Sequence, residues 1–413
     1  MDEKKLLESI TFAAKELENE LIELSKKFIS FNSVNPKTGG PGELEVSKWL
    51  KKVCEEMKVD KLDEINAPDN QVPYGFRPNI LATIKGLDSS KKIWFMTHMD
   101  KVPAGEITLW ENDPFTPVVK NGKIYGRGSE DNGSSLVSSI IAAKILKKLN
   151  IRPKYDLGLM FVSDEETGSE FGISYVLDSF KFGKDDWFIV PDSGNPEGNE
   201  IEIAEKSIMW VKMITKGKQA HASMPHLAKN AHRAAMECAI AIDSFVHTKY
   251  NDIDNLFVPN ISTFEPTKKE LNVENVNTIP ALDIICFDGR ILPHLDIDKI
   301  FSEMKQIAKI YEEKYGVEIS LEFLQKNIAP KPTSVDHPLA LSFSKAIEKT
   351  RNFQPKFVGI GGGTCAAILR KAGFPAIVWA TIEETAHQPN ENCTIEFMIK
   401  DAITYAFFLA SLE

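Results

Sequence analysis

Short apolar stretches of strand length alternate with helix-like stretches along most of this 413-residue chain, and this alternation constrains its fold most strongly. Strands are expected at Ile80–Ile84, Lys92–Met96 and Asp156–Val162, with a buried helix at Ser134–Leu149 before the third. This order is typical of an α/β domain with a central mixed, largely parallel sheet flanked by helices. Functional side chains in such sheets gather where strands end and loops begin.

The pattern changes within residues 207–325. Amphipathic strands are expected at Ile208–Thr215 and Leu282–Leu292, together with two helices, which indicates a smaller α+β unit. A linker with two prolines follows, and strands then alternate with helices again. We therefore predict a catalytic domain formed by residues 1–206 and 326–413, interrupted by an inserted domain.

Composition narrows the classes of function. A net charge of −10 argues against a general nucleic-acid binder, which would show a basic face. Apolar runs such as Ala402–Leu412 are too short to span a bilayer, and the charged start Met1–Lys5 leads into no apolar signal segment. Five scattered cysteines without a Cys-x-x-Cys pair fit reduced thiols. We expect a cytoplasmic protein whose partners include neither nucleic acid nor membrane.

A histidine and an aspartate two residues apart follow the expected strand Lys92–Met96. Alternate residues of a strand share a face, so His98 and Asp100 would point the same way. A metal-binding imidazole needs an acceptor for its second ring nitrogen, and a neighbouring carboxylate supplies one. The spacing is common, and a purely structural pair is the alternative.

Acids also gather in two loops. The glycine-rich segment Tyr125–Gly133 leads into a helix, and Asp131 in it could bind a metal or cap that helix. The acids Asp164–Glu166 follow a buried strand, where they are costly unless exposed or paired. They form either a solvated loop tip or a site in which one glutamate binds metal and its neighbour activates water. The residues alone leave both alternatives open.

Taken together, these patterns favour a metal site. Two imidazoles and three carboxylates, each at or near an expected strand end, are supplied by His98, Asp131, Glu166, Asp192 and His387. Without a cysteine, this set suits two divalent ions, with zinc expected and cobalt or manganese as alternatives. Two such ions require a bridging carboxylate.

Five segments spread over nearly the whole chain carry a family resemblance. They are THMDKVPAG (97–105), YGRGSEDNG (125–133), SDEETGSEFG (163–172), KGKQAHASMPHLAKNA (216–231) and AHQPNEN (386–392). In this order they resemble the dizinc metallopeptidases and deacylases that include aminoacylase, succinyl-diaminopimelate desuccinylase, carnosinase and bacterial dipeptidases. The resemblance implies a zinc exopeptidase-like catalytic domain and an inserted lid and dimerisation domain of a homodimer.

The resemblance also implies how the metals are held. His98, Asp131 and Asp192 would bind one ion, and Asp131, Glu166 and His387 the other, so that Asp131 bridges. The Asp131–Asn132 bond is expected to be cis. Many relatives have a lysine two residues after the bridging aspartate, which this chain lacks, and we take the difference to affect only the subgroup.

Three catalytic roles follow from the same resemblance. Asp100 would orient His98, and Glu165 would be the general base. His221 of the inserted domain would reach the partner subunit's active site and help to hold the oxyanion; a surface histidine is the alternative.

Substrate contacts are harder to assign. Arg290 could hold a substrate carboxylate in a bidentate pair or pair structurally with Asp288. Gly362 lies in the glycine-rich segment Gly359–Thr364, whose backbone N–H groups could bind the substrate's carboxylate or form a simple turn.

We predict a hydrolase that cleaves the amide or peptide bond of a small substrate by a metal-held water, with Glu165 as base. The substrate would be a dipeptide, a peptide N-terminus, or an N-acyl amino acid such as an N-succinyl or N-acetyl amino acid. An aspartate at Asp192 goes more often with aminopeptidases and dipeptidases in the family. The alternatives are a metal-binding regulatory protein without catalysis and a nucleotide-dependent enzyme that uses the glycine-rich segment.

Overall fold

The computed structural model describes residues 2–412 and consists of two compact units. Unit 1 comprises Met1–Ile203, Pro332–Phe357 and Thr364–Glu413, and unit 2 comprises Ala204–Lys331 and Val358–Gly363. The segment Val358–Gly363, which the sequence-based division assigned to the catalytic domain, therefore lies in unit 2.

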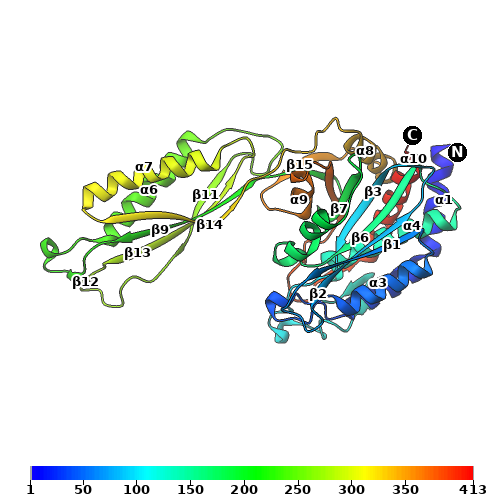
Figure 1. Ribbon diagram of the computed structural model, residues 1–413, viewed down its shortest axis with the longest axis horizontal. Coiled ribbons are helices and arrows are strands. Elements are labelled where there is room, and N and C mark those ends of the chain that lie inside the picture. Colours follow the sequence, from blue (N-terminus) through cyan, green and yellow to red (C-terminus); the bar gives the residue numbers. More distant parts are fainter. Residues whose placement is uncertain (1, 413) are drawn as a thin grey trace. The chain divides into compact units, whose positions relative to one another are not determined.

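An eight-stranded sheet organises unit 1, with strand order β1-β2-β6-β3-β7-β16-β8-β15 (Figure 1). Strands β6, β3, β7 and β16 run parallel, while β1 with β2, β2 with β6, and β16 with β8 pair antiparallel. The mixed sheet expected from the sequence is confirmed, and its parallel part is the centre. The strands are β1 Lys61–Pro68, β2 Phe76–Ile84, β3 Asp88–His98, β6 Tyr155–Val162, β7 Trp187–Asn195, β8 Glu200–Glu205, β15 Lys356–Ile360 and β16 Ala376–Thr381.

Helices flank this sheet. They are α1 Glu3–Glu16, α2 Glu18–Ile29, α3 Leu44–Glu56, α4 Ser135–Lys148, α5 Tyr175–Ser179, α8 Pro338–Arg351, α9 Cys365–Lys371 and α10 Ile395–Ser411. Because successive side chains of a strand point to opposite faces, β3 contributes side chains to the apolar layers on both faces of the sheet. Trp94 and Met96 join a cluster with α5 and α9, whereas the ring of Phe95 lies 4.9 Å from that of Tyr405 on α10.

Unit 1 also contains a small sheet of order β17-β5-β4. Its strands are β4 Val118–Lys120, β5 Lys123–Tyr125 and β17 Asn392–Thr394. Asn392 pairs with Tyr125 in the antiparallel register of β17 and β5. This pairing brings the segment after β5, which contains Asp131, next to the segment before β17, which contains His387.

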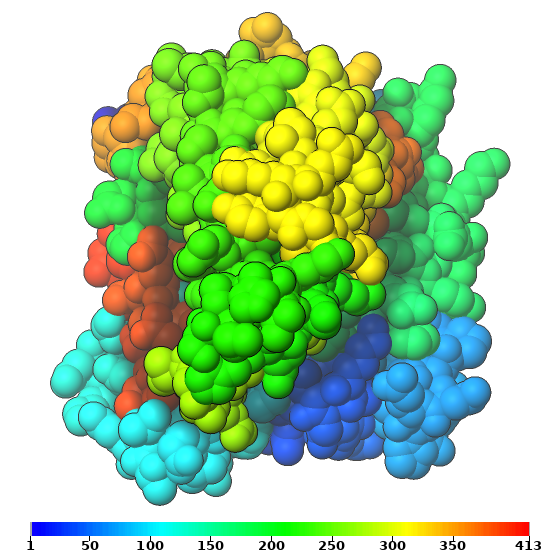
Figure 2. Space-filling view, turned by 90° about the vertical axis from the view of Figure 1, so that its left-hand side faces the viewer, coloured from blue at the N-terminus to red at the C-terminus, as the bar shows by residue number. Residues whose placement is uncertain are grey.

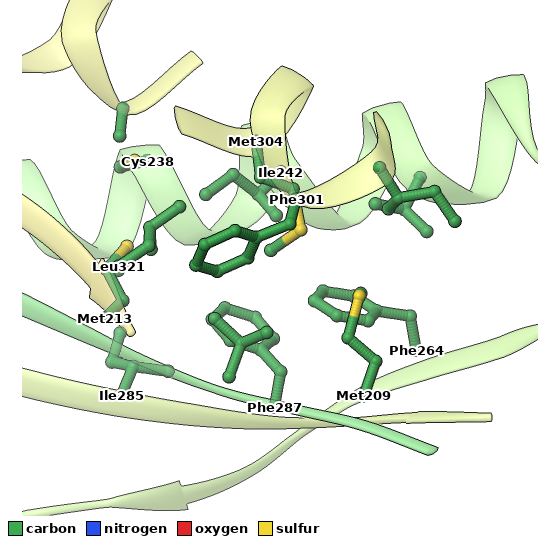
Figure 3. Packing of buried hydrophobic residues seen from close by; sticks show 14 of the residues in the cluster. Met209, Met213, Cys238, Ile242, Phe264, Ile285, Phe287, Phe301, Met304 and Leu321 are labelled. Carbon is green, nitrogen blue, oxygen red and sulfur yellow. The ribbon is translucent and has the colours of Figure 1, made fainter. Parts of the chain in front are cut away.

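Unit 2 is built on an antiparallel sheet of order β11-β13-β9-β14. Its strands and helices are β9 Ser207–Lys216, α6 Ala231–Lys249, β11 Thr263–Lys269, β13 Leu282–Ile291, α7 Ile297–Tyr315 and β14 Glu318–Asn327, with a short pair β10 Ala220–His221 and β12 Thr278–Ile279. Both helices pack on the sheet. Figure 3 shows Met209, Phe264, Phe287 and Met304 gathered between the sheet and the helices. Unit 2 thus has an apolar core of its own.

The outer side of α7, yellow in Figure 2, lies at the surface of unit 2 and exposes charged residues such as Lys305, Lys309 and Glu313. The apolar residues of α7 recur at helical spacing, so they lie on the side that faces the sheet and leave the charged residues on the outer side. None of the helices within residues 2–412 has the length and apolar character needed to cross a bilayer.

Candidate metal centre

Three neighbouring strands bring polar side chains to one edge of the large sheet. β3 ends at His98, which lies opposite Val162 at the end of parallel β6. Glu165 and Glu166 follow β6 directly, and Asp192 lies on β7, which pairs with β3 on its other side. The carboxyl ends of parallel strands form the usual location of functional sites in such sheets.

His98 is almost completely buried, with 2% of its side chain exposed. Its Nδ1 donates to the Asp100 carbonyl oxygen at 3.0 Å, which turns Nε2 toward Asp131 Oδ1 at 2.8 Å and Asp192 Oδ1 at 3.3 Å. Burial lowers the pKa of His98, but hydrogen bonds to Asp100, Asp131 and Asp192 outweigh it and hold the pKa well above its usual value.

Asp131 offers its two oxygens to two different histidines. Oδ1 faces His98, whereas Oδ2 lies 3.0 Å from His387 Nε2. The Asp131–Asn132 peptide bond is cis, as the family resemblance implied. Asn132 Nδ2 donates to Asp192 Oδ1 at 2.7 Å, so one short segment also fixes a second carboxylate.

Glu166 and His387 form the more exposed part of the site. Glu166 Oε2 lies 3.2 Å from His387 Nε2, and 55% of the His387 side chain is exposed. Hydrogen bonds first to Asp131 and then to Glu166 raise the pKa of His387 to about 10. Glu166 Oε1 is buried and has no hydrogen-bond partner among the described residues.

Asp100 organises the loop that contains both glutamates. Its Oδ1 accepts the backbone N–H of Glu165 at 3.0 Å and its Oδ2 that of Glu166 at 3.1 Å. Asn35 Nδ2 donates to Oδ2 at 2.8 Å. Asp100 therefore positions the glutamate loop as well as His98.

The donor set fits divalent cations. Ligand atoms of His98, Asp131 and Glu166 lie within 4.8 Å of one another, as do those of His98, Glu165 and Asp192. Imidazole nitrogens and carboxylate oxygens in this combination suit zinc, cobalt or manganese. The unpartnered buried Oε1 of Glu166 fits a metal ligand better than a structural carboxylate, which would be hydrogen-bonded.

The remaining predicted residues belong to unit 2. His221 is exposed, and its Nδ1 accepts the backbone N–H of Ser223 at 3.1 Å. Arg290 donates from Nε and Nη2 to both oxygens of Asp288, at 2.6 and 3.0 Å, and from Nη1 to the Gly361 carbonyl. The structural pairing left open by the sequence is thus present. Gly362 has open space where a side chain would be.

Four residues that contact this site were not singled out from the sequence. Asn35 holds Asp100, and Cys365 Sγ lies 3.9 Å from Glu165 Oε1. Glu130 and Glu391 are buried beside Asp131 and His387. Both glutamates lie inside the segments 125–133 and 386–392 that carry the family resemblance, and their position directly beside ligand candidates was the available signal.

Comparison with known sequences gives a consistent assignment. The sequence profile of peptidase family M20/M25/M40 matches residues 94–411. A metallohydrolase of Methanocaldococcus jannaschii is 42% identical over 406 residues, covering 94% of this chain and 98% of that protein. A succinyl-diaminopimelate desuccinylase of Coxiella burnetii is 28% identical over 382 residues, covering 91% and 95%.

Solved structures show the same fold. Aminopeptidase PepT from Bacillus cereus superimposes with a TM-score of 0.75 at 20% identity, covering 95% of this chain and 98% of that one. A dinuclear metal-binding peptidase of the M20 family from Bacillus subtilis gives a TM-score of 0.64 at 16% identity, covering 96% and 98%.

Proposed function

The chain belongs to peptidase family M20/M25/M40, and from this premise we propose that it is a two-metal hydrolase of an amide or peptide bond in a small substrate. Metal-dependent hydrolysis follows from the family, whose related members are metallohydrolases, peptidases and desuccinylases. The observation that supports two ions is Asp131, whose oxygens face different histidines at 2.8 and 3.0 Å.

Five side chains would hold the two ions. We assign His98, Asp131 and Asp192 to one, and Asp131, Glu166 and His387 to the other, which makes Asp131 the bridge. When bound, the two ions polarise the scissile carbonyl and lower the pKa of a water held between them. Zinc is the proposed metal, with cobalt or manganese as alternatives.

Glu165 is the residue that we assign to proton transfer. Burial, and then the negative charge of Asp192, raises the pKa of Glu165 well above its usual value in the metal-free protein. Neither proposed ligand set uses the Glu165 carboxylate, so it can accept a proton from the attacking water and donate it to the leaving amine. The Asp100 carboxylate, which accepts the Glu165 N–H, keeps this side chain beside His98 and Asp192.

His221 presents an imidazole that can serve as an oxyanion donor. Its Nδ1 accepts the backbone N–H of Ser223, which favours the tautomer with an N–H at Nε2, and Nε2 lies 3.5 Å from Asn277 Nδ2. We propose that this N–H stabilises the oxyanion formed in the partner subunit's active site, and hence that the enzyme is a homodimer joined through a lid domain formed by unit 2.

The substrate remains a choice between two chemical classes, peptides with a free N-terminus and N-acyl amino acids. Both end in a carboxylate that Arg290 and the backbone at Gly362 would contact. Nothing favours the regulatory alternative, and family membership gives the nucleotide-dependent one no support. All five cysteines are buried and free within the described residues, which supports the proposed cytoplasmic location.

Chelation and metal replacement test the proposal. The protein is stripped with a chelator, reconstituted with Zn²⁺, Co²⁺ or Mn²⁺, and assayed on dipeptides and on N-succinyl and N-acetyl amino acids. We expect turnover of one class to disappear on stripping and to return only after two ions per chain are restored. Full activity with one ion, or with none, would contradict it.

A further inference from the structure

Two segments of unit 1 exchange hydrogen bonds through buried carboxylates. We name them the Asp131 loop (residues 126–134) and the His387 loop (residues 383–392). They lie side by side because β5 precedes the first, β17 begins at the end of the second, and the two strands pair. Each loop thus presents one metal-ligand candidate to the same site.

Glu130 of the Asp131 loop reaches into the His387 loop. Its buried carboxylate accepts the backbone N–H groups of Glu383 at 2.9 Å, Thr385 at 2.7 Å and Ala386 at 3.2 Å. The Thr385 hydroxyl donates a fourth bond at 3.0 Å. Bonds to an ionised acceptor in a buried place are among the strong ones in proteins.

Glu391 of the His387 loop makes the reciprocal contact. Its Oε1 accepts the backbone N–H groups of Glu130 at 2.9 Å and Asp131 at 3.0 Å. Its Oε2 accepts the N–H of Gly128 at 3.1 Å and Arg127 Nη1 at 2.7 Å. Each loop therefore holds the backbone of the other through one glutamate.

The His387 loop requires such support because of its backbone. Glu384, His387 and Asn390 have φ values of 62°, 63° and 60°, a left-handed conformation that residues other than glycine adopt rarely. Such residues persist only where the surrounding structure enforces them. Because 55% of the His387 side chain is exposed, packing constrains it little. The bonds to Glu130 hold the residues just before it, and the His387 carbonyl oxygen lies 3.5 Å from Arg127 Nη2.

We propose that Glu130 and Glu391 form a reciprocal carboxylate clasp that positions His387 against Asp131 and thereby sets the affinity for one of the two metal ions. The affinity part rests on the proposed function. Both glutamates are positioning residues, since their oxygens accept bonds from backbone amides, the Thr385 hydroxyl and Arg127. Residues that orient metal ligands in this way change metal affinity by about 10- to 100-fold when they are replaced.

The variants Glu130→Gln and Glu391→Gln test the clasp with little change in volume. A glutamine amide presents N–H donors where backbone N–H groups already donate, so at least one bond on that side is lost. Glu383→Gln is the matched control. It makes the same change within the His387 loop, but the Glu383 carboxylate binds Lys123 and Thr394 instead of the clasp amides.

The first readout needs no metal. Hydrogen exchange of backbone amides is followed in chelator-treated protein by mass spectrometry or NMR. We expect faster exchange at residues 383–386 in Glu130→Gln and at residues 130–131 in Glu391→Gln, with β3 and unit 2 unchanged. The control should match wild type. Unchanged exchange in both clasp variants would overturn the proposal.

The second readout is titration with Zn²⁺ against a competing chelator, together with the visible spectrum of the Co²⁺ protein. Glu130→Gln should bind one ion as wild type does and the other about 10- to 100-fold more weakly, with a changed spectrum for the weakened ion. Glu391→Gln also removes an acceptor from the backbone of Asp131, the proposed bridge, so it should weaken the ion at His387 by a similar factor and the second ion as well. Equal binding of two ions by wild type and both variants contradicts the clasp alone. A wild-type protein that binds fewer than two ions contradicts the proposed function, whereas the exchange result still decides whether the clasp exists.

A milder variant is used if a glutamine variant fails to fold. If either glutamine variant lacks a cooperative unfolding transition, Thr385→Val replaces it. This change removes the hydroxyl that donates to Glu130 at almost constant volume, together with its bonds to the Asn392 backbone within the same loop. Faster exchange at residues 383–386 and a smaller loss of affinity for the same ion support the clasp. Wild-type values in both measurements overturn it.

Discussion

His98 and His387 face the same carboxylate but are positioned by different kinds of structure. His98 ends a central strand of the parallel sheet, and only 2% of its side chain is exposed. His387 lies in a loop with three residues in the left-handed conformation, and 55% of its side chain is exposed. The first is fixed by strand pairing and packing, whereas the second depends on bonds between two loops.

The two halves of the site therefore have separate structural supports. A change that loosens the loops should weaken the binding of a metal ion without lowering the stability of the fold. A change at the end of β3 should affect both the fold and the metal. The two histidines can therefore be distinguished experimentally even though both face Asp131.

Replacing Asp131 removes the carboxylate that both histidines face and should have the largest effect on metal content and activity. We expect Asp131→Ala to lose both ions and at least roughly 10⁴-fold in kcat/KM, because catalysis then lacks its metals. Metal content by plasma mass spectrometry and turnover of the reconstituted protein measure this. An Asp131→Ala protein that retains two ions would show that Asp131 is no bridge.

Glu165→Gln should reduce catalysis without changing metal binding at His98 or His387. The change removes the proton acceptor but neither ligand set, so we expect a loss of ~10²–10⁴-fold in kcat with metal content unchanged. Steady-state kinetics on the substrate class found by the activity panel, with parallel metal analysis, check it. Retained turnover would exclude Glu165 as the general base.

The two histidine variants compare the supports directly. In metal-free protein, His98→Ala should lower the free energy of unfolding by about 3 kcal/mol, because buried Asp100 loses a charged partner. His387→Ala should cost less, about 1 kcal/mol, since 55% of the His387 side chain is exposed to solvent that screens its pairs with Asp131 and Glu166. Urea unfolding in the presence of chelator measures both values. Equal losses would show that the loop and the sheet support the site alike.

Much of the candidate site could be predicted because its ligand candidates follow apolar strands whose ends meet at one edge of the sheet. His98, Glu166 and Asp192 are of this kind. Glu130 and Glu391 are not, because they are 261 residues apart and resemble ordinary solvated acids until β5 and β17 are seen to pair. Likewise, the bidentate contact of Arg290 with Asp288 required coordinates, since the sequence allowed a substrate carboxylate equally well.

Metal binding at His387 should depend on pH. His387, with a pKa of about 10, is protonated in metal-free protein at pH 8, and the ion that it binds must displace this proton. Affinity for that ion should therefore rise with pH up to about 10. At pH 8 wild type should release about one proton more than His387→Gln. Calorimetric titration in buffers of different ionisation enthalpy gives the difference, and equal proton release would contradict the assignment.

The most direct test of the two-metal account is anomalous diffraction from crystals of the zinc-reconstituted protein. We expect two peaks ~3.5–4 Å apart on either side of the Asp131 carboxylate. One should be bound by His98 and Asp192, and the other by Glu166 and His387. A single peak, or two peaks that do not share Asp131, would contradict it.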